Sequence, residues 1–373
     1  MSQSVNFIPP LDLTQQYKSI EVEVSEAVSK VLASGRYIGG TLVEEFEQQF
    51  AHYVGVSNCV GCNSGTDALY LALRALNIGV GDEVITTPFT FIATSEAIAA
   101  VGATPVFVDI DAATFNLNLD LLAAAITPKT KAIIPVHLFG QPVDMTELMK
   151  VASTYQISVI EDCAQSTGAS WEAFKVGSIG RVGCFSFFPT KNLGACGDGG
   201  AVTTNDPAIA STIKSLREHG QKERYIHAEN GINSRLDSLQ AAILMVKLRY
   251  LDSWNEKRRA IAQSYQELLS HVPGIVAPQE LAGSSAVWNQ YTIRVLEGRD
   301  KVRDLLTGRG VASMVYYPRS LHLQPVYKHL GYQLGQFPIA EQASGQVLSL
   351  PMFPELSVDQ QQQVVYSLKD CLM

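Results

Sequence analysis

The chain has 373 residues, of which 46% are hydrophobic and 17% charged, and its formal net charge is −8. This composition predicts a folded globular protein, because neither a low-complexity tract nor a short internal repeat is present. The negative charge without a basic stripe argues against nucleic acid as a partner.

The length exceeds what one hydrophobic core usually takes, so we expect a large domain and a smaller one. The first residues, MSQSVNFIPPLDL, have neither the basic nor the apolar segment of a signal peptide. No uncharged run approaches the ~20 residues that cross a bilayer. We therefore expect a cytoplasmic protein without a membrane partner.

The six cysteines are scattered through apolar stretches, which is typical of reduced thiols rather than of a disulfide framework. Cys59 and Cys62 form a C-x-x-C, but no second pair or spaced histidines complete a zinc set. We expect structural thiols and no metal.

Apolar runs alternate with helical patterns through the first half of the chain. Predicted strands and the helices after them are 58–62 and 65–76, 82–87 and 94–102, 104–110 and 119–126, 131–138 and 145–156, with a further strand at 157–162. Such alternation predicts an α/β fold with a mostly parallel sheet and helices on both faces.

The pattern changes in the second half. Strands at 184–188 and 199–204 and a helix at 206–219 continue the sheet, and a long helical pattern starts near Ser234. The remainder contains a strand at 291–295, a helix at 301–310, the segment SMVYYP and a closing helix after Pro354. We expect a large domain at 1–249, including an N-terminal helical segment, and a small domain at 250–373.

In such a sheet the ligand lies beyond the carboxyl ends of the strands. No G-x-G-x-x-G or Walker-type loop follows a strand, which argues against a nicotinamide oxidoreductase and a nucleotide hydrolase. Instead, Asn63-Ser64-Gly65-Thr66-Asp67 opens a helix after the first strand. Its N–H groups and hydroxyl suit a phosphate, although an ordinary helix cap explains the same residues.

Three further strand ends carry chemistry. Pro88-Phe89-Thr90-Phe91 offers an aromatic ring for stacking or for the core. Glu161 and Asp162 end a buried strand, with Gln165 three residues further on, and a buried acid must be paired or hydrogen-bonded to stay ionised. Such an acid has either a catalytic role or the role of a helix cap. In FSFFPTKN, apolar surroundings would lower the pKa of Lys191 and make its amine a nucleophile for a carbonyl; a lysine whose amine reaches solvent is the alternative.

A phosphate site, a planar ring, an acid for a pyridine nitrogen and an aldehyde-reactive lysine are the four requirements of pyridoxal 5′-phosphate. The sequence offers one candidate for each, and each follows a strand of the same predicted sheet. The coincidence favours this cofactor.

At these residues the chain resembles the DegT-type sugar aminotransferases, which are fold-type I pyridoxal-phosphate enzymes acting on nucleotide-linked keto-sugars. The similarity runs through nearly the whole chain, and its most specific blocks are NSGTDAL, TPFTFIAT, EDCAQSTGA, FSFFPTKNLGACGDGGAV and GINSRLDSLQAAIL. It implies a large domain with a mostly parallel seven-stranded sheet flanked by helices, and a smaller α+β C-terminal domain.

The resemblance also implies roles. Lys191 would form the internal aldimine and move protons, and Asp162 would keep the pyridine nitrogen protonated. Pyridoxamine phosphate would be the intermediate form of the cofactor. The remaining implied cofactor contacts are Gln165 at the ring hydroxyl, Phe91 on the ring face, Gly65, Thr66 and Ser186 at the phosphate, and Asn233 from a neighbouring subunit.

Asn233 implies a homodimer with shared active sites, although a helix cap would explain the same residue. A lysine at position 191, where the family's dehydratases have histidine, favours transamination with glutamate as donor. Arg235, Tyr316, Tyr317, Arg319 and His322 lie in blocks that resemble substrate-facing segments. Tyr316, Tyr317 and His322 would otherwise be packing residues.

The blocks TPFTFIAT and GINSRLD most resemble those of family members that aminate the 3-position of nucleotide-linked 3-keto sugars, including uronic acids. The resemblance therefore favours a UDP- or dTDP-linked 3-keto sugar as the acceptor. Amination at the 4-position stays an alternative. From another class, a non-catalytic regulator that binds the cofactor is a further alternative, against which Lys191, Asp162 and Gln165 argue.

Overall fold

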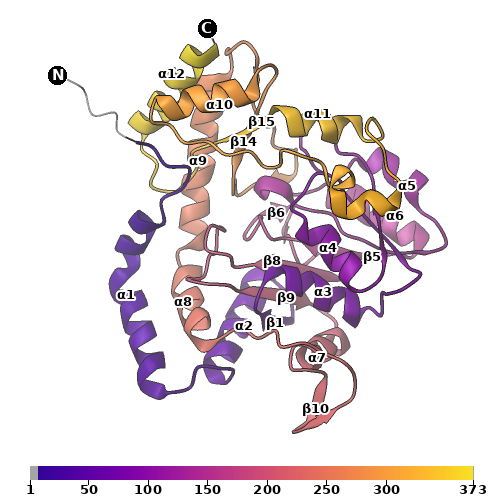
Figure 1. Ribbon diagram of the computed structural model, residues 1–373. Helices are drawn as coiled ribbons and strands as arrows, with labels where there is room; N and C mark the ends of the chain where they lie inside the picture. Colours follow the sequence, from indigo (N-terminus) through magenta and orange to yellow (C-terminus); the bar gives the residue numbers. More distant parts are fainter. Residues whose placement is uncertain (1–6, 373) are drawn as a thin grey trace.

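The computed structural model describes residues 7–372. Its centre is a seven-stranded sheet in the order β1-β9-β8-β5-β4-β2-β3, in which β9 alone runs antiparallel to its neighbours (Figure 1). The strands are β1 Asn58–Cys62, β2 Glu83–Thr86, β3 Thr104–Phe107, β4 Thr130–Ile133, β5 Ser158–Asp162, β8 Val182–Ser186 and β9 Gly200–Thr204. The predicted fold class is confirmed.

Alternate residues of these strands point to opposite faces, and both faces are covered by helices. Val84 and Ile160 pack in one cluster with α3, α4 and α7, whereas Ile85 and Val159 pack in another with α6. The helices of this part are α1 Leu13–Ser34, α2 Thr41–Val54, α3 Gly65–Ala75, α4 Ala93–Ala100, α5 Leu122–Ala125, α6 Met145–Tyr155, α7 Pro207–Leu216 and α8 Ser238–Leu248.

Some predicted bounds were wrong. The predicted strand 131–138 ends at Ile133, and Pro135, which has no N–H to donate to a ladder, follows two residues later. The predicted helix 119–126 is a 3-10 turn, Leu119–Leu121, followed by the single turn of α5. The long helical pattern from Ser234 is two helices, because the chain turns between α8 and α9 Leu251–Leu269.

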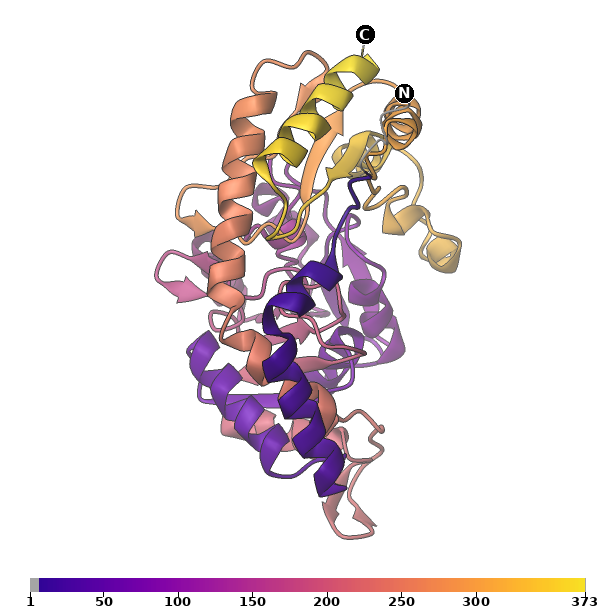
Figure 2. The same ribbon diagram turned by 90° about the vertical axis from the view of Figure 1, so that its left-hand side faces the viewer.

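A second hydrophobic core lies at the opposite end of α9 from the large sheet (Figure 2). It is formed by α9, α10 Arg299–Gly308, α12 Val358–Leu372 and a sheet of β12 Ile275–Val276, β14 Tyr291–Val295 and β15 Val347–Leu350. Ile8 belongs to this core as well.

The segment that contains α11, Pro338–Gln346, packs instead against the part of the chain that forms the large sheet. Leu321, Tyr327 and Phe337 share a buried cluster with Phe89 and Phe139. At the start of α11, the Asp109 carboxylate accepts N–H bonds from Ile339 and Ala340 at 3.0 and 2.9 Å. The two parts of the chain are therefore joined through this segment as well as through α9.

Two small sheets lie at the periphery. They are β10 Gln221–Glu223 with β11 Ile226–His227, and β6 Ser170–Trp171 with β7 Phe174–Lys175 and β13 Ser284–Ser285. The first forms a hairpin that projects from the body in both views (Figures 1 and 2). Short 3-10 turns are also present at Leu138–Gly140, Leu321–Leu323 and Pro325–Leu330. Among residues 7–372 no helix is long and apolar enough to cross a membrane.

Candidate active site

The loop after β1 and the end of β8 meet across β9. Cys62 and Ser186 both pair with Gly200 of β9. A Cβ on Gly200 would lie 2.3 Å from the Ser64 carbonyl oxygen, and one on Gly65 would lie 2.6 Å from the Ser186 Cβ. Only glycine therefore allows the start of α3 to approach Ser186 this closely.

The start of α3 has the chemistry of an anion site. Ser64 caps the helix, since its Oγ accepts the Asp67 N–H at 3.0 Å, so the cap that we considered is present. The first N–H groups of a helix, here those of Gly65 and Thr66, have no carbonyl partner within the helix and lie at its positive end. With the Ser186 hydroxyl beside them, these groups suit a phosphate.

Asp162 ends β5 and is only 4% exposed. Its Oδ1 accepts the Ala164 N–H at 3.1 Å, and its Oδ2 accepts the Thr94 hydroxyl at 2.8 Å. Because Thr94 donates to Asp162, the Thr90 hydroxyl 3.2 Å away must donate to Thr94. Burial raises the pKa of Asp162, while these hydrogen bonds and the Lys191 charge oppose the rise.

Lys191 follows β8, the strand that pairs with β5, and its side chain is half-buried. Burial lowers the pKa of its ammonium to about 8, although the nearby Asp162 carboxylate favours the charged form. The neutral amine is therefore a minor form near neutral pH, but a far more abundant one than for an exposed lysine, in the direction that the sequence predicts. A half-buried lysine of lowered pKa near a buried carboxylate, at the ends of adjacent strands, is the central feature of the site.

Asn192 anchors the lysine loop. Its Nδ2 donates to Asn255 Oδ1 at 2.7 Å and to the Val287 carbonyl at 2.9 Å, and its Oδ1 accepts from Asn289 at 2.8 Å. Asn255 belongs to α9, so this network ties the loop to the long helix. Sequence reasoning missed both Asn192 and Thr94, since a polar residue beside a motif has no periodic signal of its own.

Glu161, the neighbour of Asp162, has a structural explanation. Its carboxylate accepts the N–H groups of Gly177, Ile179 and Gly180 at 2.6–2.9 Å. It also accepts from His137 Nε2 at 3.1 Å, because His137 Nδ1 accepts the Val143 N–H. Ligand-type atoms of His137, Glu161 and Cys163 cluster here, but these hydrogen bonds already use those of His137 and Glu161.

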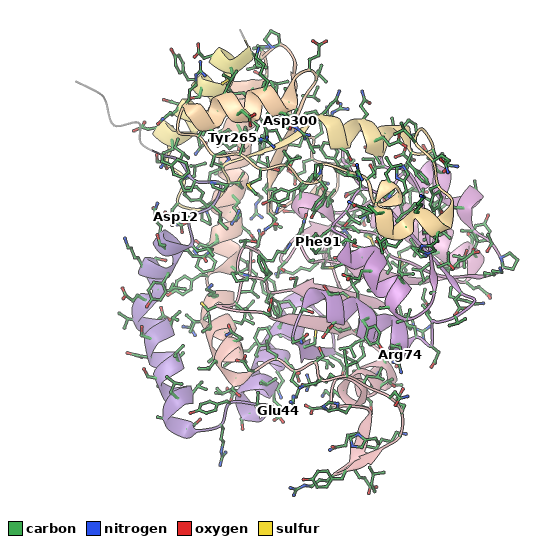
Figure 3. All side chains as sticks on the ribbon, in the orientation of Figure 1. Asp12, Glu44, Arg74, Phe91, Tyr265 and Asp300 are labelled. Carbon is green, nitrogen blue, oxygen red and sulfur yellow. The ribbon has the colours of Figure 1, made fainter. Side chains whose placement is uncertain are left out.

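The loop after β2 contains two aromatic residues, of which one lies in the core and the other is exposed. Phe89 is fully buried, whereas 56% of Phe91 is exposed, at the start of α4 near the middle of the molecule (Figure 3). Phe91 therefore has the free ring face that stacking needs. Gln165 is buried, and Tyr317 connects it to Phe91. The Gln165 Nε2 donates to the Tyr317 hydroxyl, and the centroid of the Tyr317 ring lies 6.1 Å from that of Phe91.

The segment around Asn233 lies beside the phosphate loop. The Ser234 hydroxyl donates to Asn63 Oδ1 at 3.1 Å, while Asn233 itself is exposed. The helix-cap alternative for Asn233 was wrong, because Asp237 caps α8. Arg235 is half-buried and forms an ion pair with Glu218 at 3.3 Å.

The other sequence-selected residues lie on the segment after α10. Tyr316 and Tyr317 are partly buried, and Arg319 is exposed. His322 is 2% exposed, and its Nε2 lies 3.0 Å from the Glu341 carboxylate. Burial lowers the pKa of His322, although the Glu341 carboxylate favours the charged imidazolium. The contact with Glu341 is compatible with the packing alternative, whereas the buried Nδ1 has no hydrogen-bond partner among the described residues.

All six cysteines are free, and Cys196 alone among them is exposed. Burial raises the pKa of the Cys62 thiol to about 12 and that of Cys59 well above its usual range. These two thiols are therefore inert, in agreement with the structural role expected for the C-x-x-C.

The lowered pKa of Lys191 can be tested without any ligand. In competitive acetylation of the cofactor-free protein, the rate at Lys191 should level off above a midpoint near pH 8, because only the neutral amine reacts. A short model peptide with one lysine, whose amine titrates near pH ~10.4, is added to the reaction as the internal control. Peptide mapping by mass spectrometry measures both rates, and equal midpoints would contradict the buried environment.

An amine, a carboxylate, the free N–H groups at the start of α3 and an exposed aromatic ring follow the carboxyl ends of β8, β5, β1 and β2 in the same sheet. This set matches the groups of pyridoxal phosphate one by one. Independent comparison agrees with this chemistry, since residues 18–369 match the DegT/DnrJ/EryC1/StrS aminotransferase family. The chain belongs to this family.

Similar proteins cover nearly the whole chain. A transaminase of Streptomyces venezuelae for dTDP-3-amino-3,4,6-trideoxy-α-D-glucose is 43% identical over 97% of this chain and 96% of its own. A UDP-2-acetamido-2-deoxy-3-oxo-D-glucuronate aminotransferase of Pseudomonas aeruginosa is 44% identical, with coverages of 93% and 95%. A "pleiotropic regulatory protein" of Geobacillus stearothermophilus is 48% identical, with coverages of 97% and 98%.

Solved structures agree. DesV of S. venezuelae in complex with a ketimine intermediate superposes with a TM-score of 0.95 at 43% identity, covering 98% of both chains. The PLP form of a putative sugar aminotransferase of Streptococcus pneumoniae has a TM-score of 0.89 at 29% identity, covering 98% and 97%. This chain is a nucleotide-sugar aminotransferase, and the predicted cofactor, pyridoxal phosphate, is confirmed.

Proposed function

We propose that this aminotransferase moves an amino group from L-glutamate to C3 of a UDP- or dTDP-linked 3-keto sugar, with Lys191 as the essential amine. The observation that carries the proposal is the juxtaposition of Lys191 with buried Asp162 at the ends of adjacent strands. The reaction takes place in the cytoplasm, as the sequence predicts.

Bound pyridoxal phosphate supplies an electron sink for the carbon that gains or loses the amine. Lys191 would hold the cofactor through its amine and would move the proton at the reacting carbon. Asp162 holds a proton on the pyridine nitrogen, and Thr94 keeps that carboxylate ionised by donating to it.

Five further residues would hold the cofactor in this proposal. Phe91 covers one face of its ring, and Gln165 donates to its ring hydroxyl. The N–H groups of Gly65 and Thr66 and the hydroxyl of Ser186 bind its phosphate, which the close approach of α3 to β8 supports. These contacts orient the ring so that Lys191 faces its reactive carbon.

The 3-position is favoured because two of the relatives described above carry it in their names. Arg235 and Tyr316 are the sugar-side candidates; binding an anionic group would require Arg235 to leave Glu218. The test is product formation from glutamate with matched pairs of UDP- and dTDP-linked 3-keto and 4-keto sugars. If the 4-keto sugars were aminated faster than the matched 3-keto sugars, the amination would be assigned to C4 instead of C3.

A regulator that binds the cofactor without turnover is the second candidate, and the name of the G. stearothermophilus relative favours it. Such a role would not need a lysine of lowered pKa next to a buried acid. A complete screen of keto-sugars without product, from a protein that binds the cofactor, would favour the regulator.

Asn233 completes the site of a partner subunit in the proposed homodimer. Subunits carrying Lys191→Ala and Asn233→Ala should each be inactive alone. After dissociation and reassembly of a 1:1 mixture, about a quarter of wild-type activity should return, because half of the dimers are mixed and each has one intact site. No recovery in mixed dimers would place Asn233 in its own chain's site.

A further inference from the structure

The Tyr317 hydroxyl is bound to a residue that faces the cofactor in the proposed function. Gln165 Nε2 donates to the Tyr317 oxygen at 3.1 Å. At the other side of the amide, Gln165 Oε1 accepts the Phe139 N–H at 2.7 Å. Among the described residues, Tyr317 is therefore the hydrogen-bonding partner of the Gln165 amino group.

These two bonds determine the orientation of the Gln165 amide. A backbone N–H can only donate, so the Gln165 oxygen must face Phe139 and the amino group must face away. One of the two amino hydrogens is used by Tyr317. The second is the only donor that the side chain has left for a ligand.

Tyr317 is itself held in place. Its ring lies 6.1 Å from Phe91 and 6.4 Å from Phe89, measured between ring centroids. Burial raises the pKa of its hydroxyl well above the usual range, so the hydroxyl stays neutral, and its oxygen accepts from Gln165. One tyrosine thus contacts both Phe91 and Gln165, the proposed stacking and hydroxyl-binding residues.

Tyr317 reaches this place from the second core. Three residues earlier, Met314 exchanges backbone hydrogen bonds with Ser349 of β15 at 3.1 and 2.7 Å. The segment then crosses to the edge of the large sheet, where Tyr317 packs on Phe89. The orientation of Gln165 therefore depends on how the second core sits against the sheet.

We propose that Tyr317 is a positioning residue, which directs the free amino hydrogen of Gln165 toward the ring hydroxyl of pyridoxal phosphate. This differs from the substrate contact expected from the sequence, and it rests on the proposed function of Gln165. A donor at the ring hydroxyl stabilises its anionic form, and most strongly after the cofactor-bound lysine nitrogen has lost its proton. Tyr317 thereby lowers the pH at which that proton leaves.

The test is a pH titration of the visible absorption band of the cofactor-loaded protein. Tyr317→Phe keeps the ring and its packing but removes the acceptor for Gln165. Its midpoint should rise by about 0.7 pH unit, which corresponds to the ~1 kcal/mol of one hydrogen bond. Tyr265→Phe is the matched control, because it also removes a buried tyrosine hydroxyl, which donates to the Pro351 carbonyl at 3.0 Å in the second core, and its midpoint should stay at the wild-type value.

A double-mutant cycle separates action through Gln165 from a direct effect. Gln165→Leu should raise the midpoint at least as far, and adding Tyr317→Phe to it should cause no further rise. Additive shifts, or an unchanged midpoint with a raised KM for the sugar, would overturn the inference. A wild-type protein that takes up no pyridoxal phosphate would overturn the proposed function and this inference with it.

Discussion

Replacing Lys191 with alanine is expected to lower the rate of amino transfer by at least about 10⁴-fold while the protein stays folded. In the proposed function, the change removes the nucleophile and an acid–base group that alone contributes about 10² to 10⁴-fold. Burial lowers the pKa of this amine, and no other lysine is described next to Asp162 that could replace it.

The fold should survive because the loop is held by other groups. The Lys191 backbone N–H donates to the Phe188 carbonyl at 2.9 Å, and the Asn192 side chain bonds Asn255 and Val287. Thermal unfolding and single-turnover kinetics with glutamate measure the two effects. Lys191→Arg is the matched control, since it keeps a positive charge but has no neutral amine. Amino transfer at the wild-type rate in either variant would remove Lys191 from the reaction.

Asp162→Asn is expected to lower kcat/KM by about 10² to 10³-fold, the usual cost of losing one charged contact to a reacting system. Asparagine has nearly the same shape, and its Oδ1 can still accept the Ala164 N–H. The change therefore removes the negative charge that the proposed function places at the cofactor's pyridine nitrogen, while leaving β5 in place. An unchanged kcat/KM would show that this charge has no role.

Thr94→Val gives a graded version of the same test. Thr94 donates to the Asp162 carboxylate, which favours its charged form, so removing the hydroxyl should raise the pKa of Asp162. The acid limb of the kcat/KM profile should then move to higher pH by about 1 unit, since a bond to a charged group contributes about 1.5 kcal/mol or more. Thr94→Ser keeps the donor and should leave the profile at its wild-type position.

Much of the sheet could be predicted from the sequence because its strands are buried on both faces. Such strands are short continuous apolar runs, and the polar residue that ends each run is conspicuous. Asp162 after ISVIE and Lys191 after FSFFPT were found in this way. The antiparallel hairpin of β10 and β11 was missed, because its exposed, polar residues have no alternation of apolar positions.

Side-chain roles inside a motif depended on packing that the sequence does not contain. Phe89 and Phe91 are two residues apart, and only the neighbouring rings Phe115 and Phe139 make Phe89 the core residue. Asn233 precedes a helix as a cap would, yet the chain continues to Asp237 before the helix begins.

Contacts between distant parts of the chain were also beyond prediction. Asn192 meets Asn255 and Asn289, which are 63 and 97 positions away in the sequence. Tyr317 meets Gln165 across 152 positions. Each of these residues is an isolated polar or aromatic residue, and the sequence around it does not indicate whether its side chain is exposed or buried.

The most direct test of the central claim is the visible absorption spectrum of the purified protein before and after glutamate, followed by borohydride reduction and peptide mapping. We predict a cofactor band that glutamate bleaches and, in the protein reduced without glutamate, the cofactor's mass on Lys191. A protein that shows no band after pyridoxal phosphate is added, or that carries the label on another lysine, would contradict the site described for this aminotransferase.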